Sequence, residues 1–480
     1  MIALATSFFQ DGDFITALYI LAVIFFIIVL RGLAGPQTAV AGNKIAAVGM
    51  LVAVIATLIG EDVVPDAETA ILIAVGIVIG TAIGIPSARS VKMTAMPQMV
   101  ALFNGVGGGA VALIAWAEFR RHFTGDSGEW DEKVMIPALF AAIIGSISFW
   151  GSNIAFGKLQ EILPGRPIKV PGQQLLNLIL LIICVGSAIA IAAGEHSELL
   201  FVLGILVAAA ILGNMVVLPI GGADMPVVIS LLNAFTGLSA AAAGIALDNF
   251  ALIVAGTIVG ASGSILTNLM AVAMNRSVPS IIAGGFGGGD AAPAGASAGA
   301  GAGGTARSTS AQDAAIQLAY ARQVVVVPGY GMAVAQAQHA VREMALALEK
   351  KGVEVKYAIH PVAGHMPGHM NVLLAEADVP YDQLKEMDDI NPEFGRTDVS
   401  LIIGANDVTN PAANNDPGSP IYGMPILEVD KSQSVIVLKR SMSSGFAGID
   451  NPLFYDPKTA MLFGDAKASV SEITAELSNL

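Results

Sequence analysis

The sequence contains little cysteine and little charge. Of its 480 residues one is cysteine and only 13% are Asp, Glu, Lys or Arg, whereas 54% are hydrophobic. A soluble enzyme carries about 25% charged residues, so the composition excludes an ordinary soluble enzyme. The single cysteine, Cys184, lies inside an apolar run. A disulfide framework within the chain and two-cysteine redox chemistry are therefore excluded as well.

Basic residues are also scarce. The chain has 24 Lys and Arg against 38 Asp and Glu, which gives a formal net charge of −14. No cluster of Lys and Arg forms the footprint of a nucleic-acid groove, so we expect no nucleic-acid partner, and we expect no bound metal. The N-terminus lacks the basic segment of a cleavable signal peptide, and the first apolar run is long enough to span a bilayer.

Long apolar runs fill the first 275 residues, and the mean hydropathy of the chain is +0.70. Membrane-spanning helices need about 20 apolar residues, and the apolar runs of this region have that length. The candidate spans are 14–30, 45–60, 68–88, 99–118, 134–157, 174–193, 198–220, 226–247 and 250–273. We therefore expect an α-helical polytopic membrane bundle of about nine spans over residues 1–275.

The charges between the spans predict how the bundle is oriented. One side carries Arg31, Lys44, Arg89, Lys92, Lys158, Arg166, Lys169 and Arg276. The other side carries only Arg120, Arg121 and Lys133. Because basic loops stay in the cytoplasm, this asymmetry predicts an external N-terminus and, after nine spans, a cytoplasmic C-terminal domain.

A few polar residues interrupt the apolar runs. Asn104 and Asn233 lie within predicted spans, and Asp224 lies at the end of one. Polar groups inside a membrane are costly, and they indicate either hydrogen bonds between helices or an ion path. No histidine falls inside a predicted span, so a proton route here would need bound water and a titratable group from elsewhere.

A tract rich in Gly, Ala and Ser follows the last span, from Gly284 to Ser310. Such compositions form flexible chains, so we expect a linker over residues 276–310. It either allows the domain after it to move or serves as a passive spacer.

Residues 311–480 alternate between strand-like and helix-like segments. The predicted strands are Gln323–Val327, Val353–Ile359, Val399–Ile403, Ser434–Leu438 and Met461–Phe463. The predicted helices are Met332–Lys350, Met370–Ala377, Tyr381–Asn391 and Ser469–Leu480. Continuous apolar strands between helices predict a Rossmann-like, doubly wound parallel sheet.

The residues that follow these strands indicate a dinucleotide site, because ligands of such sheets bind beyond the carboxyl ends of the strands. The first strand leads into Gly329-Tyr-Gly-Met-Ala-Val334, which is typical of a turn that holds a pyrophosphate. An NAD site usually has a carboxylate after the second strand, and none is present near Ile359. Lys439 and Arg440 follow the fourth predicted strand and could neutralise a 2′-phosphate, which favours NADP(H) over NAD(H).

Several strings in this order closely resemble the β subunit of the proton-translocating NAD(P) transhydrogenases. The strings are Gly221-Gly-Ala-Asp-Met-Pro226, Ala273-Met-Asn-Arg-Ser277, Pro328-Gly-Tyr-Gly-Met-Ala-Val-Ala-Gln-Ala-Gln338, Pro367-Gly-His-Met-Asn-Val-Leu-Leu-Ala-Glu-Ala377, Gly404-Ala-Asn-Asp407, Lys439-Arg-Ser-Met442 and Gly464-Asp-Ala-Lys-Ala468. The resemblance implies a proton-translocating membrane domain over 1–275 and an NADP(H)-binding domain over 311–480. It implies direct hydride transfer between NADP(H) on this chain and NAD(H) on a separate α subunit, coupled to inward proton flow. It further implies a bacterial inner membrane location and a dimer of αβ units.

The resemblance also implies roles for individual positions. The pyrophosphate turn would be Gly329, Tyr330, Gly331, Met332, Ala333 and Val334, and the 2′-phosphate clamp Lys439, Arg440 and Ser441. Further nucleotide contacts would be Val362, Ala363, Gly364, His365, Gly404, Ala405, Gly464, Asp465, Ala466 and Lys467. Asp407, beside Asn406, would lie near the nicotinamide, and the positions tied to proton coupling would be Asn104, Asp224, Asn233 and Arg276.

Two positions depart from the family pattern. Many members have histidine where this chain has Asn104, and Asn does not titrate, so we expect a histidine on a membrane helix of the α subunit to replace it. His365 stands where we expect arginine, and a neutral imidazole would weaken a phosphate contact.

Two other functions remain open. A channel or transporter with an NADP-sensing cytoplasmic domain would bind the nucleotide without reducing it. A membrane-anchored dehydrogenase would need an acid or base beside the nicotinamide, and only Asp407 and the histidines near 360–370 could serve.

Overall fold

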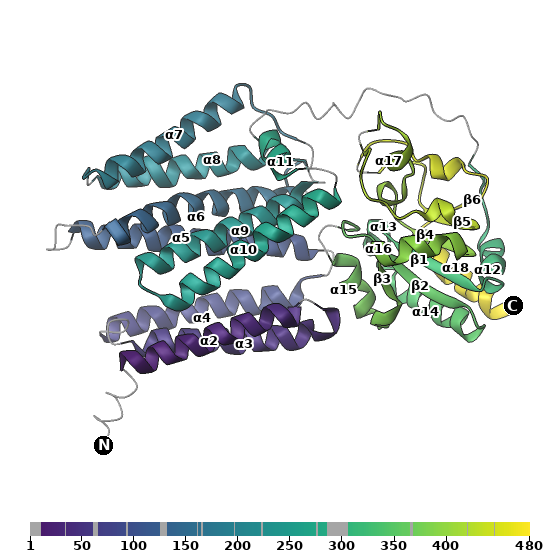
Figure 1. Cartoon of the computed structure of the whole chain (residues 1–480), viewed down its shortest axis with the longest axis horizontal. Helices are drawn as coiled ribbons and strands as arrows, with labels where there is room; N and C mark the ends of the chain where they lie inside the picture. The colour runs from purple at the N-terminus through teal and green to yellow at the C-terminus, as the bar shows by residue number, and fades with distance from the viewer. Residues whose placement is uncertain are drawn as a thin grey trace, which may run out of the picture. The chain divides into compact units, whose positions relative to one another are not determined.

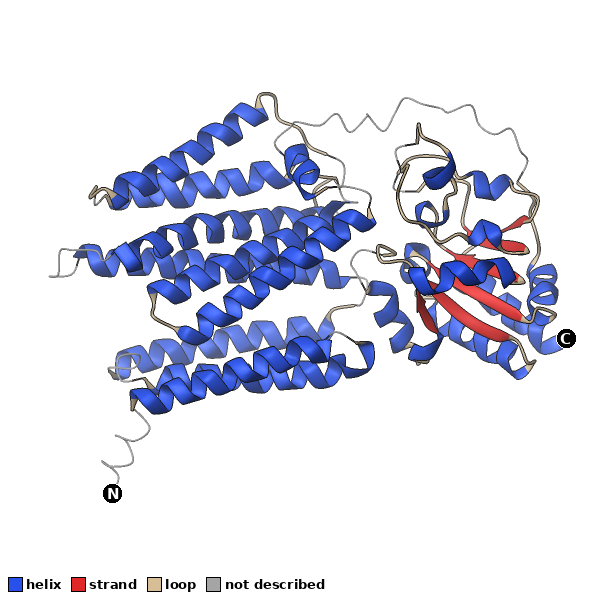
Figure 2. Cartoon of the chain, in the orientation of Figure 1, coloured by secondary structure: helices blue, strands red, loops and turns tan. Residues whose placement is uncertain are grey.

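The computed structural model describes residues 11–480 except 34, 61–65, 93–94, 125–131, 161, 165–166, 196, 222–223, 275–276, 286–305, 365–367, 420 and 446. The chain divides into two compact units. Figure 2 shows that one consists of helices and that all strands belong to the other. Each unit is described separately.

In the described part of the chain, nine helices are long and apolar enough to cross a membrane, as the sequence predicted. They are α2 (Gly12–Leu33), α3 (Pro36–Ile59), α4 (Ala67–Ser90), α5 (Met96–Thr124), α6 (Glu132–Leu159), α7 (Gln173–Ala192), a π-type segment (Leu200–Val207) continuous with α8 (Ala208–Val217), α9 (Met225–Ala246) and α10 (Phe250–Ala273) (Figure 1).

Glycines allow the central helices to pack backbone against backbone. A Cβ added to Gly145 of α6 would lie 2.7 Å from the carbonyl oxygen of Gly108 on α5, and one added to Gly108 would lie 2.9 Å from the oxygen of Gly145. Gly256 of α10 meets the backbone of Ala241 on α9 as closely. In lipid the hydrophobic effect does not drive helices together. Close van der Waals packing at small residues stabilises such crossings instead. By contrast, no described residue of α4 is buried.

The second unit is built on a parallel sheet of six strands in the order β3-β2-β1-β4-β5-β6. Its strands are β1 (Gln323–Pro328), β2 (Glu354–Ile359), β3 (Leu384–Glu386), β4 (Val399–Ile403), β5 (Ser434–Lys439) and β6 (Thr459–Phe463). All five predicted strands are present. The inner strands β1 and β4 are buried along their whole length, which explains their continuous apolar sequence.

The helices of this unit are α12 (Ala311–Ala319), α13 (Tyr330–Val334), α14 (Gln338–Lys350), α15 (His369–Glu376), α16 (Met387–Ile390), α17 (Ala412–Asn415) and α18 (Ala466–Asn479). Helices α12 and α14 both pack against α18. A separate core cluster joins the strand residues Val325 and Val437 to Phe394 and Phe454, which lie on short helical turns. The sheet is therefore covered on both faces.

The sixth strand corrects one prediction. The sequence predicted one helix over Tyr381–Asn391, but the helical residues there are a 3-10 turn at Tyr381–Gln383, the short α16 and Asn391, which begins another 3-10 turn. Between the first turn and α16, β3 pairs with β2, with Tyr357 opposite Leu384. Hydrogen bonding to the free edge of β2 thus outweighs the local helical pattern.

The long predicted helix Met332–Lys350 is in fact two helices. Helix α13 ends at Val334, and α14 begins at Gln338. Between them Gln336 has φ of 49°. A left-handed residue cannot continue a right-handed helix, so the chain turns before α14 begins.

The segment predicted as a linker contains a short helix, α11 (Val278–Gly285). Near its other end the chain docks on β6. The N–H of Thr309 donates to the carbonyl of Met461 at 2.9 Å, and the N–H of Met461 donates to the carbonyl of Arg307 at 2.7 Å. This bridge covers the outer edge of β6, which would otherwise expose unpaired backbone groups.

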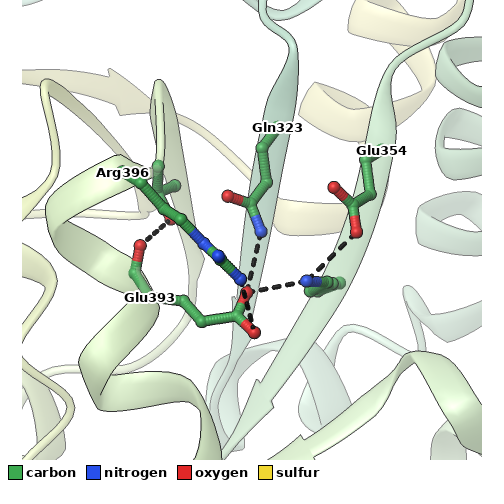
Figure 3. A network of polar contacts seen from close by, with 6 residues as sticks. Gln323, Glu354, Glu393 and Arg396 are labelled. Atoms are coloured by element: carbon green, nitrogen blue, oxygen red, sulfur yellow. Dashed lines mark hydrogen bonds and ion pairs between the residues drawn. The ribbon is translucent and has the colours of Figure 1, made fainter.

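A polar network joins the amino ends of β1 and β2 (Figure 3). The carboxylate of Glu393 accepts hydrogen bonds from Lys356 at 2.7 Å and from Gln323 at 2.9 Å, and it pairs with Arg396 at 3.0 Å. Burial alone would raise the pKa of Glu393, but these donors lower it to about 2. Lys356 also pairs with Glu354 at 3.0 Å.

The network should contribute stability that depends on pH. Because the folded-state pKa of Glu393 lies below its ordinary value of 4.5, its contribution is present above pH 4.5 and is lost as pH falls toward 2. We expect Glu393→Gln to lower the opening free energy of β1 and β2 by about 1–3 kcal/mol at pH 7. Hydrogen exchange of their amides measures this change. The exposed residue Glu472 provides the control substitution to Gln, and equal effects of the two variants would contradict the assignment.

Candidate functional site

The strand order reverses between β1 and β4. The two loops that follow these strands are in direct backbone contact. The N–H of Gly329, after β1, donates to the carbonyl of Ile403 at 2.9 Å. The N–H of Gly331 donates to the carbonyl of Gly404, after β4, at 2.9 Å. In open parallel sheets the crevice at such a reversal is where ligands bind.

Close approach of the two loops requires glycine. A Cβ on Gly329 would overlap the backbone of Ala405, and a Cβ on Gly331 would lie 2.8 Å from the Cα of Gly404. Gly404 itself has φ of +67°, and a Cβ there would overlap the backbone of Gly331. The loops can therefore present bare backbone to a ligand.

A cleft of about 680 Å³ opens at this edge of the sheet. That volume lies within the range of small-molecule and cofactor sites, roughly 300–1,000 Å³. The predicted nucleotide-site residues that line it are Gly329, Tyr330, Gly331, Val334, Val362, Ala363, Gly364, Gly404, Ala405, Asn406, Asp407, Lys439, Arg440, Ser441, Gly464, Asp465 and Ala466. Residues from five strand ends thus meet in one place.

Four predicted residues are not among those that line the cleft. Met332 and Ala333 are fully buried and pack beneath the turn. Lys467 lies in the first turn of α18, where its N–H donates to the side chain of Asp465. His365 lies outside the described residues.

Other lining residues were missed by the sequence reasoning: Ala335, Val408, Leu438, Ser443, Ser444 and Gly445. The feature of the sequence that could have identified them is the short segment Ser443-Ser-Gly445, which follows soon after the basic pair. Its contribution depends on how the loop folds back over the sheet edge, which spacing does not reveal.

The loop after β5 folds back onto Asp407. The N–H of Ala447 donates to Oδ2 of Asp407 at 2.9 Å. A Cβ on Gly445 would lie 2.5 Å from Oδ1 of the same carboxylate. Beside it, the side-chain amide of Asn451 donates to Oδ1 of Asn406 at 3.0 Å. The Asn406–Asp407 pair is therefore held by the loop between β5 and β6, which is distant from it in sequence.

The basic pair at the end of β5 has two different environments. Lys439 is partly buried, and its ammonium donates to the carbonyl of Ser443. Arg440 is exposed on the rim of the cleft. The hydroxyls of Ser441 and Ser443 lie 2.8 Å apart. Hydroxyls, a guanidinium and an ammonium together form a wall suited to a phosphate.

At the end of β2 a buried histidine takes the place that a carboxylate occupies in NAD sites. Nε2 of His360 lies 2.8 Å from the carbonyl oxygen of Pro425, and the N–H of Val362 donates to Nδ1 at 3.2 Å. Nδ1 must therefore be unprotonated and Nε2–H must be the donor. Burial lowers the pKa of His360 to about 4, and the bond to Pro425 opposes this only in part. The side chain is thus neutral at pH 7 and shapes the loop that reaches the cleft.

Three of the predicted coupling residues, Asn104, Asp224 and Asn233, lie in the helical unit. The amide of Asn104 on α5 donates to the hydroxyls of Ser152 at 2.9 Å and Ser148 at 3.3 Å on α6. The hydroxyl of Ser148 in turn lies beside Thr236 of α9. Asn104 thus makes the kind of hydrogen bond between helices that the sequence suggested as one alternative.

Of the other three predicted coupling positions, two lie on or beside α9. Asp224 directly precedes α9, and Asn233 is partly buried within it. Arg276 lies outside the described residues. The loop that leads to Asp224 is held by the buried Lys158, whose ammonium donates to the carbonyls of Leu218 and Ile220.

Comparison with known proteins gives a consistent result. A family model described as "NAD(P) transhydrogenase beta subunit" matches residues 15–476. Two relatives, both described as "NAD(P) transhydrogenase subunit beta" and both from Rhodospirillum rubrum, are each 49% identical to the chain over 462 residues. Each alignment covers 95% of this chain and 97% of the relative.

The contact between the two loops should be sensitive to a single methyl group. We expect Gly404→Ala to destabilise the sheet unit by about 2–4 kcal/mol, because a left-handed alanine is strained and its Cβ would overlap Gly331. Hydrogen exchange of β1 and β4 measures the loss. Gly395→Ala is the control, since a Cβ at Gly395 meets no atom within 4 Å. Unchanged protection in Gly404→Ala would disprove the packing argument.

His360 should make the sheet unit unstable in mild acid. Its folded-state pKa of about 4 lies below the ordinary value of 6.5, so the folded state binds fewer protons. The contribution of His360 to the free energy of unfolding is complete above pH 6.5. It declines below that pH and is lost as pH falls through 4, and the total loss is about 3 kcal/mol. The imidazole resonances report the pKa directly. A titration midpoint near 6.5 in the folded chain would refute the assignment.

Proposed function

The chain belongs to the NAD(P) transhydrogenase beta subunit family, and on that premise we propose that it binds NADP(H) in the cleft and exchanges hydride directly with NAD(H) held by a partner alpha subunit. The exchange is coupled to inward movement of protons through the helical unit. In this proposal residues 1–275 form the proton-translocating domain, residues 276–310 the linker, which includes α11 and the stretch docked on β6, and residues 311–480 the NADP(H)-binding domain.

The proposal rests on one observation: the residues that follow four of the strands surround the cleft and suit a 2′-phosphorylated dinucleotide. The glycine loops after β1 and β4 leave room for a pyrophosphate against bare backbone. Lys439 and Arg440 supply cations for a 2′-phosphate at the end of β5. The end of β2 has the neutral His360 in place of the carboxylate that would bind a free ribose 2′-hydroxyl. The set favours NADP(H) over NAD(H).

The residues of the chain bind and orient, and none needs to act as a nucleophile. The nicotinamide ring of the bound nucleotide supplies the hydride chemistry itself. Asn406 and Asp407 lie in the cleft, fixed by Asn451 and Ala447, and we assign them a place beside that ring. Because this chain supplies one nucleotide, the second must come from the alpha subunit, within about 3–3.5 Å of the first.

The helical unit supplies the membrane half of the proposal. We propose a bacterial inner membrane location with the N-terminus outside and the sheet domain in the cytoplasm, because the distribution of basic loops favours this orientation. Asn104, Asp224, Asn233 and Arg276 form the coupling positions. Asn104 does not titrate, so a histidine from a membrane helix of the alpha subunit completes the proton path in a dimer of αβ units.

The function is tested by purifying the chain with its alpha subunit in sealed vesicles. NADPH should reduce an NAD analogue, and the reaction should acidify or alkalinise the lumen according to its direction. A nucleotide that binds but is never oxidised would instead identify an NADP-sensing channel or transporter. Loss of proton movement on replacing the partner histidine would support the proton path, and an unaffected pump would refute it.

Arg440 provides a test of the nucleotide assignment. We expect Arg440→Leu to raise the Kd for NADP⁺ by about 10- to 100-fold, because a charge-assisted bond to the 2′-phosphate is lost. The Kd for NAD⁺ should change less than about twofold, since NAD⁺ lacks that phosphate. Arg322→Leu, at the opposite end of the sheet and with an 85% exposed side chain, is the matched control. Equal losses for both nucleotides would exclude a 2′-phosphate role.

A further inference from the structure

The ammonium of Lys439 lies over the face of an aromatic ring. Its Nζ is 4.8 Å from the ring centroid of Phe454, within the range of about 6 Å in which a cation is attracted to a ring face. On the other side the same ammonium donates to the carbonyl of Ser443. Both contacts are satisfied by one position of a side chain that otherwise has many rotamers.

Phe454 is a rigid support for this contact. It is 1% exposed and belongs to the core cluster that contains Val437 of β5 and Met461 of β6. It lies on the turn Pro452–Tyr455, where the N–H of Leu453 donates to the side chain of Asn451 at 3.0 Å. The ring therefore cannot move without disturbing the sheet.

The same turn is tied to the wall of the cleft. Asn451 donates to the side-chain oxygen of Asn406 at 3.0 Å and to its backbone oxygen at 3.2 Å. The hydroxyl of Tyr455 donates to Asp450 at 2.9 Å. The position of the ring beneath Lys439 is therefore fixed relative to the loop after β4.

The charges around Lys439 make this support necessary. Burial lowers the pKa of Lys439, and the carboxylates of Asp407 and Asp450 oppose that shift. These two carboxylates attract the ammonium and would compete with a bound phosphate for it. The electron-rich face of the Phe454 ring and the carbonyl of Ser443 are both fixed in place. They hold the ammonium of Lys439 at the wall of the cleft without neutralising its charge.

We propose that Phe454 is a positioning residue that sets the preference for a 2′-phosphorylated nucleotide by holding the ammonium of Lys439 at the wall of the cleft. The inference rests on the proposed function and adds to it a determinant that never touches the nucleotide. Arg440 then provides an exposed and adaptable cation, whereas Lys439 provides a fixed one.

The test measures binding of NADP⁺ and NAD⁺ to the purified full-length chain. We expect Phe454→Leu to raise the Kd for NADP⁺ by about 3- to 20-fold, with less than a twofold change for NAD⁺. Phe394→Leu, a buried phenylalanine of the same core cluster, is the control for loss of packing alone.

A double-mutant cycle with Lys439→Met separates support of the lysine from general damage. If Phe454 acts through Lys439, adding Phe454→Leu to Lys439→Met weakens NADP⁺ binding no further. Additive losses, or equal losses for NAD⁺, would overturn the inference. Should the leucine variant fail to fold, pentafluorophenylalanine at 454 keeps the shape and removes the negative ring face. Unchanged NADP⁺ affinity in that protein would also overturn it.

The outcome is distinct from a failure of the proposed function. A wild-type chain that prefers NAD⁺, or binds neither nucleotide, would contradict the NADP(H) assignment itself. A wild type that prefers NADP⁺, with a selectivity that survives loss of the ring, would leave that assignment intact and exclude only the role of Phe454.

Discussion

The contact between the loops after β1 and β4 is the constraint on which the cleft depends. Two backbone segments meet there with no side chain between them, because Gly329, Gly331 and Gly404 each occupy a place where a Cβ would collide. The strands on either side connect in opposite directions, so their loops diverge above this contact and leave a space between them. The residues at the other strand ends reach into that space. Without the close contact, the same strand-end residues would border a wider and shallower gap.

The sequence predicted those features that depend on long, continuous patterns. In the part of the chain that the structure describes, nine helices long and apolar enough to cross a membrane confirm the prediction, because each apolar run is far longer than a strand or a core helix requires. The five longer strands are confirmed because a parallel sheet buries both faces and so needs mostly apolar strands. The strand ends could then be located, and with them most of the residues that line the cleft.

What could not be predicted depends on contacts between distant segments. Strand β3 has three residues and exists because β2 offers a free edge. The break at Gln336 follows from a single backbone angle that no composition rule signals. The place of Ser443–Gly445 in the cleft requires the loop after β5 to fold back toward Asp407. Met332 and Ala333 illustrate the converse, since they belong to the glycine motif by sequence but are buried beneath the turn.

The docking of residues 307–309 on β6 has a mechanical consequence. The chain enters the sheet domain through a short stretch that runs parallel to β6 and is bonded to it at Met461. A pull on the preceding segment would load these hydrogen bonds along the strand, in shear, rather than peel them apart one at a time. β6 continues into Gly464 and Asp465, which line the cleft. The attachment point of the domain lies on β6, and one wall of the cleft lies in the residues that directly follow the same strand.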